Sequence, residues 1–130
     1  MNVDWTNLQA PSLDEFEALA VAALESLPRP FRDLCKDVRC YVAEFAEGDV
    51  LDELGIESEF DLMGLFTGVG MAQEGITPTG RMPNIVHLYR RPILDYWAEH
   101  EETLGAVVTH VLIHEIGHHF GFSDADMAAI

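Results

Sequence analysis

Hydrophobic residues recur at helical spacing near the start of the chain. Between Ser12 and Pro28 the apolar positions are Phe16, Leu19, Ala20, Ala23, Leu24 and Leu27. Ser12 and Glu15 have the spacing of a capping box, in which each side chain satisfies a free backbone amide at a helix start. The pattern therefore predicts an amphipathic helix that begins after Ser12 and ends before Pro28.

Two later segments are rich in β-branched and aromatic residues, which predicts strands. Residues 38–45 carry apolar side chains on both faces, as expected of a central strand that is covered on both sides. Residues 85–90 show the clearest strand pattern. Because Pro92 cannot donate a hydrogen bond to a ladder, we expect this strand to end there or to lie at a sheet edge.

The remaining segments predict further helices, of which residues 103–120 form the last and longest, and a loop. We expect helical structure in residues 31–36, 49–54, 93–102 and 103–120. Residues 61–68 form a mixed apolar run that ends among glycines. Glycines and prolines recur in residues 68–83, which predicts a loop, with a hairpin as the alternative.

Length, composition and charge exclude several classes of protein. A chain of 130 residues is expected to form one domain, residues 1–130. The net charge of -16, with only seven Lys and Arg residues, argues against nucleic-acid binding, which needs a basic surface. No stretch approaches the roughly 18 apolar residues of a membrane helix, so we expect no membrane partner.

The N-terminus and the cysteines indicate a cytoplasmic protein. Residues 1–5 lack a basic segment followed by an apolar run, so they do not resemble a secretory signal. Cys35 and Cys40 do not have CxxC spacing, and two cysteines cannot form a disulfide framework. We therefore expect both thiols to be reduced.

Three histidines lie on one stripe of the last predicted helix. His110, His114 and His118 follow one another at four-residue steps, which is about one helical turn. His114, Glu115 and His118 match the HExxH motif, in which two imidazoles bind one Zn²⁺. Gly117 within the motif costs a helix roughly 1 kcal/mol relative to alanine, and we attribute it to the close approach of another backbone.

A zinc site used for hydrolysis needs a third protein ligand and an open position for water. Gly121 can adopt the left-handed conformation that ends a helix, so the chain can turn back and bring the Asp124 carboxylate to the metal. Asp126 and His119 are the alternatives for this third ligand. We expect His110 to be a core or surface histidine rather than a fourth ligand.

The segment HEIGHHFGFSD thus reads HExxHxxGxxD and resembles the zincin metallopeptidases, with the spacing of the metzincin branch and aspartate in place of its third histidine. A closer resemblance, clearest in IVHLYRRPIL and VVTHVLIHEIGHHFGFSDADM, is to small bacterial proteins called minimal zincins. The resemblance implies a zinc-binding α+β domain. In it, a small mixed sheet packs on the metal-binding helix and an N-terminal helix.

Two features distinguish this chain from the large proteases that it resembles. Metzincins have a methionine turn beneath the metal, and Met127 is the one candidate for it after Asp124. The C-terminal subdomain that walls one side of their substrate cleft has no counterpart in the few residues that follow. We therefore expect an open, shallow site.

These observations favour a zinc-dependent metallopeptidase in which Glu115 is the general base. The donor that stabilises the oxyanion stays open among His87, Tyr89, Arg90 and His110. A peptide or protein substrate could pair in extended form with residues 85–90 as an edge strand. The alternatives are a zinc-binding interaction or regulatory domain with weak or no hydrolytic activity, and hydrolysis of a non-peptide amide.

Overall fold

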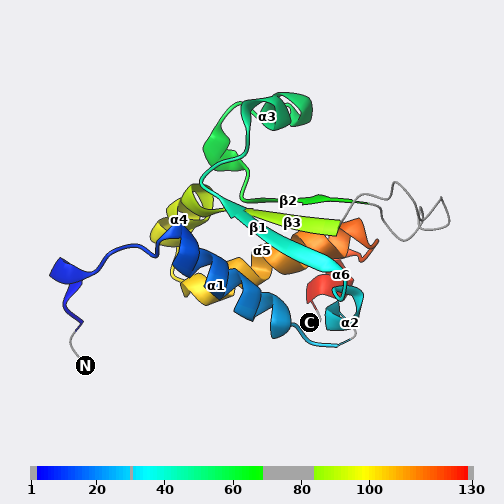
Figure 1. The fold of residues 1–130 in the computed structure, drawn as a ribbon, viewed down its shortest axis with the longest axis horizontal. Coiled ribbons are helices and arrows are strands. Elements are labelled where there is room, and N and C mark those ends of the chain that lie inside the picture. The colour runs from blue at the N-terminus through cyan, green and yellow to red at the C-terminus, as the bar shows by residue number, and fades with distance from the viewer. Residues whose placement is uncertain (1–2, 30, 69–83, 129–130) are drawn as a thin grey trace.

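The computed structural model describes residues 3–29, 31–68 and 84–128 (Figure 1). Short 3-10 helices are η1 (Trp5–Asn7) and η2 (Glu59–Asp61). The strands are β1 (Val38–Ala43), β2 (Gly64–Thr67) and β3 (Asn84–Tyr89). The α-helices are α1 (Leu13–Glu25), α2 (Phe31–Leu34), α3 (Gly48–Leu54), α4 (Arg90–Glu99), α5 (Leu104–His119) and α6 (Asp124–Ala128). The predicted α+β fold is confirmed.

The three described strands form one mixed sheet in the order β1-β3-β2. β1 runs parallel to β3, and β2 runs antiparallel to it. β3 is therefore the central strand. Of the two alternatives for residues 85–90, the strand ends before Pro92, at Tyr89, and the alternative of an edge strand is wrong. The physical reason lies in Pro92, which belongs to the first turn of α4, where a missing amide hydrogen costs no hydrogen bond.

β1 was predicted to be central and covered on both faces, and this prediction is also wrong. Among the described residues β1 pairs only with β3, so it lies at a sheet edge. Its side chains alternate between a buried and an exposed face: Val38 is buried, whereas Tyr41 is 58% exposed. Tyr41 on the apolar outer face packs edge-on against His87 of the neighbouring strand. The apolar residues of this face therefore do not indicate a covering layer.

The core lies between the sheet and two helices, α1 and α5, which lie side by side beneath it in Figure 1. Its fully buried members come from α1, β3, α4 and α5: Phe16, Ala20, Val86, Leu88, Ile93, Val108, Leu112 and Ile116. The buried apolar residues of α5 form one stripe that packs into this core. The polar residues of the helix therefore lie on its other faces.

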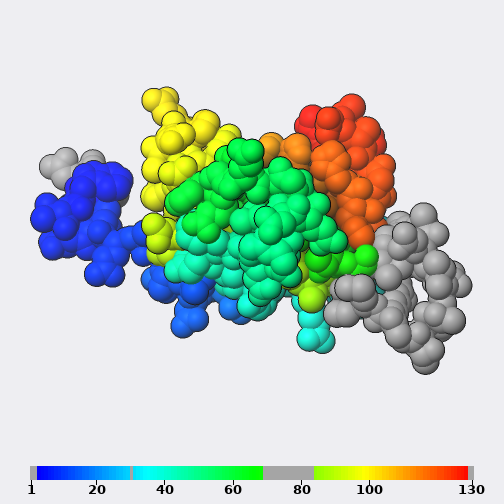
Figure 2. All heavy atoms as spheres, turned by 90° about the horizontal axis from the view of Figure 1, so that it is seen from above, coloured from blue at the N-terminus to red at the C-terminus, as the bar shows by residue number. Residues whose placement is uncertain are grey.

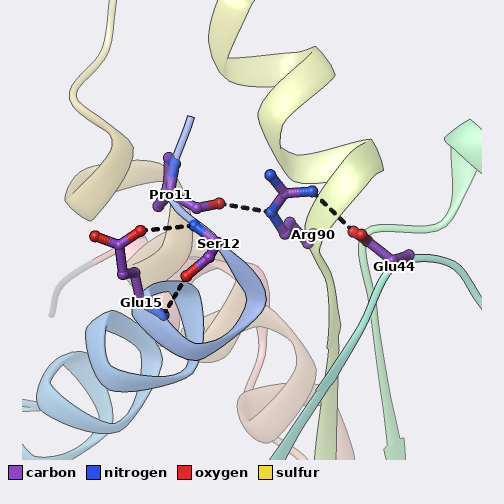
Figure 3. Close-up of polar contacts among 5 residues, drawn as sticks. All are labelled: Pro11, Ser12, Glu15, Glu44 and Arg90. Carbon is purple, nitrogen blue, oxygen red and sulfur yellow. Dashed lines mark hydrogen bonds and ion pairs between the residues drawn. The ribbon is translucent and has the colours of Figure 1, made fainter. Parts of the chain in front are cut away.

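The capping box predicted for the first helix is present (Figure 3). The hydroxyl of Ser12 accepts a hydrogen bond from the backbone amide of Glu15 at 3.2 Å, and the Glu15 carboxylate accepts one from the amide of Ser12 at 2.9 Å. The helix ends at Glu25, with Ser26 as its C-cap, two residues before Pro28.

Arg90 joins three parts of the chain that are distant in sequence (Figure 3). Its Nε donates to the carbonyl oxygen of Pro11 at 2.6 Å, and its Nη1 lies 2.9 Å from Oε1 of Glu44. The side chain is only 15% exposed. The start of α1, the chain after β1 and the start of α4 are therefore held at one point.

The helices predicted in the later segments are present, but their boundaries differ from the predicted ones. The helix predicted over residues 93–102 begins at Arg90, and the run 61–68 contains the end of η2 and all of β2. The predicted loop 68–83 lies almost entirely outside the described residues. Within the described part of the chain, no helix is long and apolar enough to cross a membrane.

Candidate metal centre

The histidine stripe predicted for the last helix lies on α5. Thr103 caps this helix by accepting a hydrogen bond from the amide of Ala106 at 3.1 Å. The ring centroids of His110 and His114 are 4.3 Å apart, and those of His114 and His118 are 5.8 Å apart. The four-residue spacing therefore places successive imidazoles on neighbouring turns of one face.

A tight turn ends α5 and redirects the chain toward these histidines. Gly121 has φ +84°, which is the left-handed conformation that its position was predicted to need. The amide of Phe122 donates to the carbonyl of Gly117 at 2.8 Å, and the amide of Gly121 donates to His118 at 3.2 Å. This hydrogen-bond pair is a Schellman motif, and Asp124 follows it as the first residue of α6.

The structure brings His114, His118 and Asp124 together. Each offers one ligand atom, and these atoms lie within 4.8 Å of one another. Nε2 of His118 lies 3.7 Å from Oδ1 of Asp124. Two imidazoles and one carboxylate form a donor set typical of catalytic zinc, so the residues present fit this metal.

Burial favours the form of His114 that can bind a metal. Partial burial lowers the pKa of His114, and the neighbouring His110 and His118 lower it further against a smaller opposing effect of Asp124. The neutral imidazole is the species that coordinates a metal ion. His118 and Asp124 are more open to solvent, with side chains 59% and 83% exposed.

Both alternative third ligands are engaged elsewhere. The Asp126 carboxylate accepts a hydrogen bond from the Ser123 amide at 3.0 Å, and the Ser123 hydroxyl accepts one from the Asp126 amide, so the pair caps α6. The ring of His119 stacks on Phe66 at a centroid distance of 3.9 Å. Neither residue belongs to the group of ligand atoms that converges at the end of α5.

Glu115 lies on the side of α5 that faces β2. A Cβ atom built on Gly64 of β2 would lie 3.2 Å from Cγ of Glu115 and 2.8 Å from Cγ1 of Val111. Burial raises the pKa of Glu115, with a smaller opposing effect of His118. Gly64 was missed by the sequence analysis, although a glycine inside an apolar run is a known signal of a close approach between backbones.

Comparison with known proteins assigns the chain to a family. A family model described as a zincin-like metallopeptidase matches residues 35–130. This chain belongs to the zincin-like metallopeptidase family. The match covers the sheet, α5 and α6, and it implies a divalent metal, typically zinc. A search of curated proteins found no match.

In this zincin-like metallopeptidase, Met127 of α6 packs against the motif glycine of α5. A Cβ atom on Gly117 would collide with Sδ of Met127 and would lie 2.9 Å from its Cγ. Met127 is 5% exposed. The prediction that a backbone approaches Gly117 is therefore wrong, because the close neighbour is the Met127 side chain, which the short turn after α5 folds back against the helix.

The four residues predicted as possible oxyanion donors differ in their contacts and in their exposure. The Nε2 of His87 is 3.0 Å from Oγ1 of Thr67 on β2, and Arg90 is held by Pro11 and Glu44. Tyr89 is 5% exposed, and burial is the largest of the causes that raise its pKa. Of the four, His110 is exposed and lies beside the candidate ligand His114.

Proposed function

We propose that this zincin-like metallopeptidase is a zinc-dependent peptidase in which His114, His118 and Asp124 hold the metal and Glu115 is the general base. The observation that carries the proposal is the convergence of three ligand atoms within 4.8 Å at the end of α5. Glu115, the next residue after His114, is partly buried on the side toward β2.

The chemistry divides between the metal and this carboxylate. Zinc, when bound, polarises a scissile carbonyl and lowers the pKa of water toward neutrality. Glu115 accepts the proton of the attacking water and delivers it to the leaving amine. The partial burial that raises the pKa of Glu115 suits this role, because a base that must hold and release a proton works best with a pKa near the working pH.

The edge of β2 offers a binding place for the substrate main chain. Among the described residues β2 pairs with β3 alone, so its other edge has no strand partner there. β2 also touches Val111 and Glu115 of α5 through the close approach at Gly64. An extended peptide added along this edge would receive main-chain hydrogen bonds while passing the general base.

The test compares wild type with Glu115→Gln and His118→Ala, using bound zinc and cleavage of a peptide library as parallel measurements. We expect wild type to bind zinc and cleave, Glu115→Gln to bind zinc without cleavage, and His118→Ala to lose both. Cleavage that survives Glu115→Gln unchanged would defeat the proposed base.

The second candidate is a zinc-binding interaction or regulatory domain. The exposure of the His118 and Asp124 side chains, 59% and 83%, favours it, because an open site leaves a metal accessible to a ligand from a partner protein. Zinc retained by wild type and Glu115→Gln, with no cleavage of peptides or of non-peptide amides by either, would support this candidate over the peptidase.

A further inference from the structure

A small cavity lies between η2 and α4, beside the start of β2. Its volume is about 240 Å³. Four of its lining residues form an apolar and aromatic surface: Phe60, Met63, Pro92 and Tyr96. Because pockets for drug-sized ligands begin at about 300 Å³, this cavity has the size for a single side chain rather than for a whole cofactor.

The other lining residues of the cavity are acidic. Asp61 comes from η2, and Asp95 and Glu99 stand four residues apart on one face of α4. All three are exposed, none of the described lining residues is basic, and none of the three carboxylates pairs with a basic side chain of the described chain. Like charges at this spacing repel one another, so a cation in the cavity would be attracted by all three.

The combination fits a long basic side chain. Lysine and arginine bury their methylene stems on apolar surface while their charged groups stay at its rim. The ring of Phe60 packs edge-to-face against Phe45 and is 41% exposed, so it adds aromatic surface at the rim of the cavity. A neutral aliphatic side chain would fill the apolar part and leave the carboxylates unpaired.

The cavity and the candidate general base both adjoin the start of β2. Met63 lines the cavity, and the next residue is Gly64, whose close approach to Glu115 marks the point where β2 meets the metal-binding helix. Figure 2 shows α4 and α6 on the same side of the molecule, separated along its length. A peptide that extends along β2 past Glu115 therefore reaches the cavity within a few residues, since each residue of a strand advances about 3.3 Å.

We propose that the cavity between η2 and α4 is a specificity subsite that receives a lysine or arginine side chain of an extended peptide substrate. The proposal rests on the proposed peptidase function and adds the chemical class of the substrate. A small acidic cavity beside β2, whose second edge has no strand partner among the described residues, selects peptides with one basic residue at a fixed place relative to the scissile bond.

The experiment uses peptide libraries in which each position carries either lysine or its uncharged analogue norleucine. Cleavage is measured with the zinc-loaded wild type, and binding is measured with zinc-loaded Glu115→Gln. We expect lysine to be preferred at one position by about three- to tenfold in both assays, because each exposed ion pair contributes a modest amount. The preference should decrease as the salt concentration rises.

The variant Asp95→Asn/Glu99→Gln should remove most of this preference and leave bound zinc and cleavage of norleucine peptides unchanged. The matched control is Asp52→Asn/Glu53→Gln on α3, which makes the same change of charge at two exposed residues outside the cavity and should keep the preference. A preference that persists in the first variant, or disappears equally in both, overturns the subsite.

The two proposals fail in different ways. If peptides are cleaved but lysine and norleucine are treated alike at every position, the subsite is wrong and the peptidase function stands. If no peptide is cleaved, the peptidase function fails, and the binding measurement with Glu115→Gln still decides whether the cavity prefers a basic side chain. Equal binding of both peptides, or no binding of either, counts against the subsite.

Discussion

The Nε2 atom of His118 lies 3.7 Å from Oδ1 of Asp124, although the two residues belong to different helices. The Schellman motif around Gly121 produces this relationship, because it ends α5 and starts the chain back within three residues. A carboxylate and an imidazole at this distance, with His114 on the preceding turn of α5, can share one divalent ion.

Replacing Asp124 by alanine should therefore weaken zinc binding. Loss of an outer-shell partner of a metal ligand costs about 10- to 100-fold in affinity, and loss of a ligand itself should cost at least that much. Competition titration with a zinc chelator measures the effect. The matched variant is Asp126→Asn, which alters a neighbouring carboxylate that caps α6 and should retain zinc affinity within a few-fold. Equal losses in both variants would remove Asp124 from the site.

The parts of the fold and of the site that depend on neighbouring residues could be predicted from the sequence. The capping box of Ser12 and Glu15, the histidine stripe of α5 and the left-handed Gly121 all follow from spacings of a few residues, and each is present. Local hydrogen bonds and helical periodicity determine such features, so they need no knowledge of the rest of the fold.

The parts that depend on distant residues could not be predicted. Strand order is set by which strands pair across long stretches of chain, and the apolar pattern of β1 and β3 does not contain that information. The contact of Gly64 with Glu115 joins residues about 50 positions apart in the chain, and Met127 meets Gly117 only after a turn of particular geometry. Sequence patterns therefore predicted the candidate metal ligands more readily than the surfaces around them.

Glu115→Gln should stabilise the metal-free protein at neutral pH. Burial raises the pKa of Glu115 above its ordinary value of 4.5, so the folded state disfavours the charged carboxylate. This cost is absent below about pH 4.5, where the group is protonated in both states, and it is complete once the pH has risen through the folded-state pKa. Glutamine avoids the cost at every pH.

Thermal or urea denaturation of the chelator-treated proteins over a pH series measures this difference. The variant should be more stable than wild type near pH 7, and the two should converge at low pH. Glu101→Gln, at an exposed position, is the control and should show no such pH-dependent gain. A wild type that is the more stable protein at pH 7 would contradict an energetic cost of burying Glu115.

Gly117→Ala should destabilise the protein although alanine is the better helix former. The added Cβ would meet the Met127 side chain, which is buried and has little room to move. Overpacking of a buried position costs about 1–3 kcal/mol, and over most of this range the cost is larger than the gain of about 1 kcal/mol in helix propensity. Gly105→Ala on the same helix is a matched control, because a Cβ there has nothing within 4 Å and should stabilise by up to about 1 kcal/mol. Denaturation curves measure both changes.

A double variant tests whether the collision with Met127 is the cause. In Gly117→Ala/Met127→Ala the neighbouring side chain is shorter, which should relieve the collision. Gly117→Ala should therefore cost less stability in the Met127→Ala background than in wild type.

Arg90→Ala should destabilise the fold by about 1–3 kcal/mol, because it leaves the Pro11 carbonyl and the Glu44 carboxylate without this donor. Arg90→Lys should recover only part of the loss, since one ammonium group does not reproduce two donors of a planar guanidinium.

Arg29→Ala is the control. Arg29 forms an ion pair with Asp33 at 4.0 Å, and the two side chains are 72% and 50% exposed. Its loss should change stability by less than about 0.5 kcal/mol. Urea denaturation compares the three variants with wild type. If Arg90→Ala proved as mild as Arg29→Ala, the junction of α1, β1 and α4 would owe its stability to apolar packing instead of to this arginine.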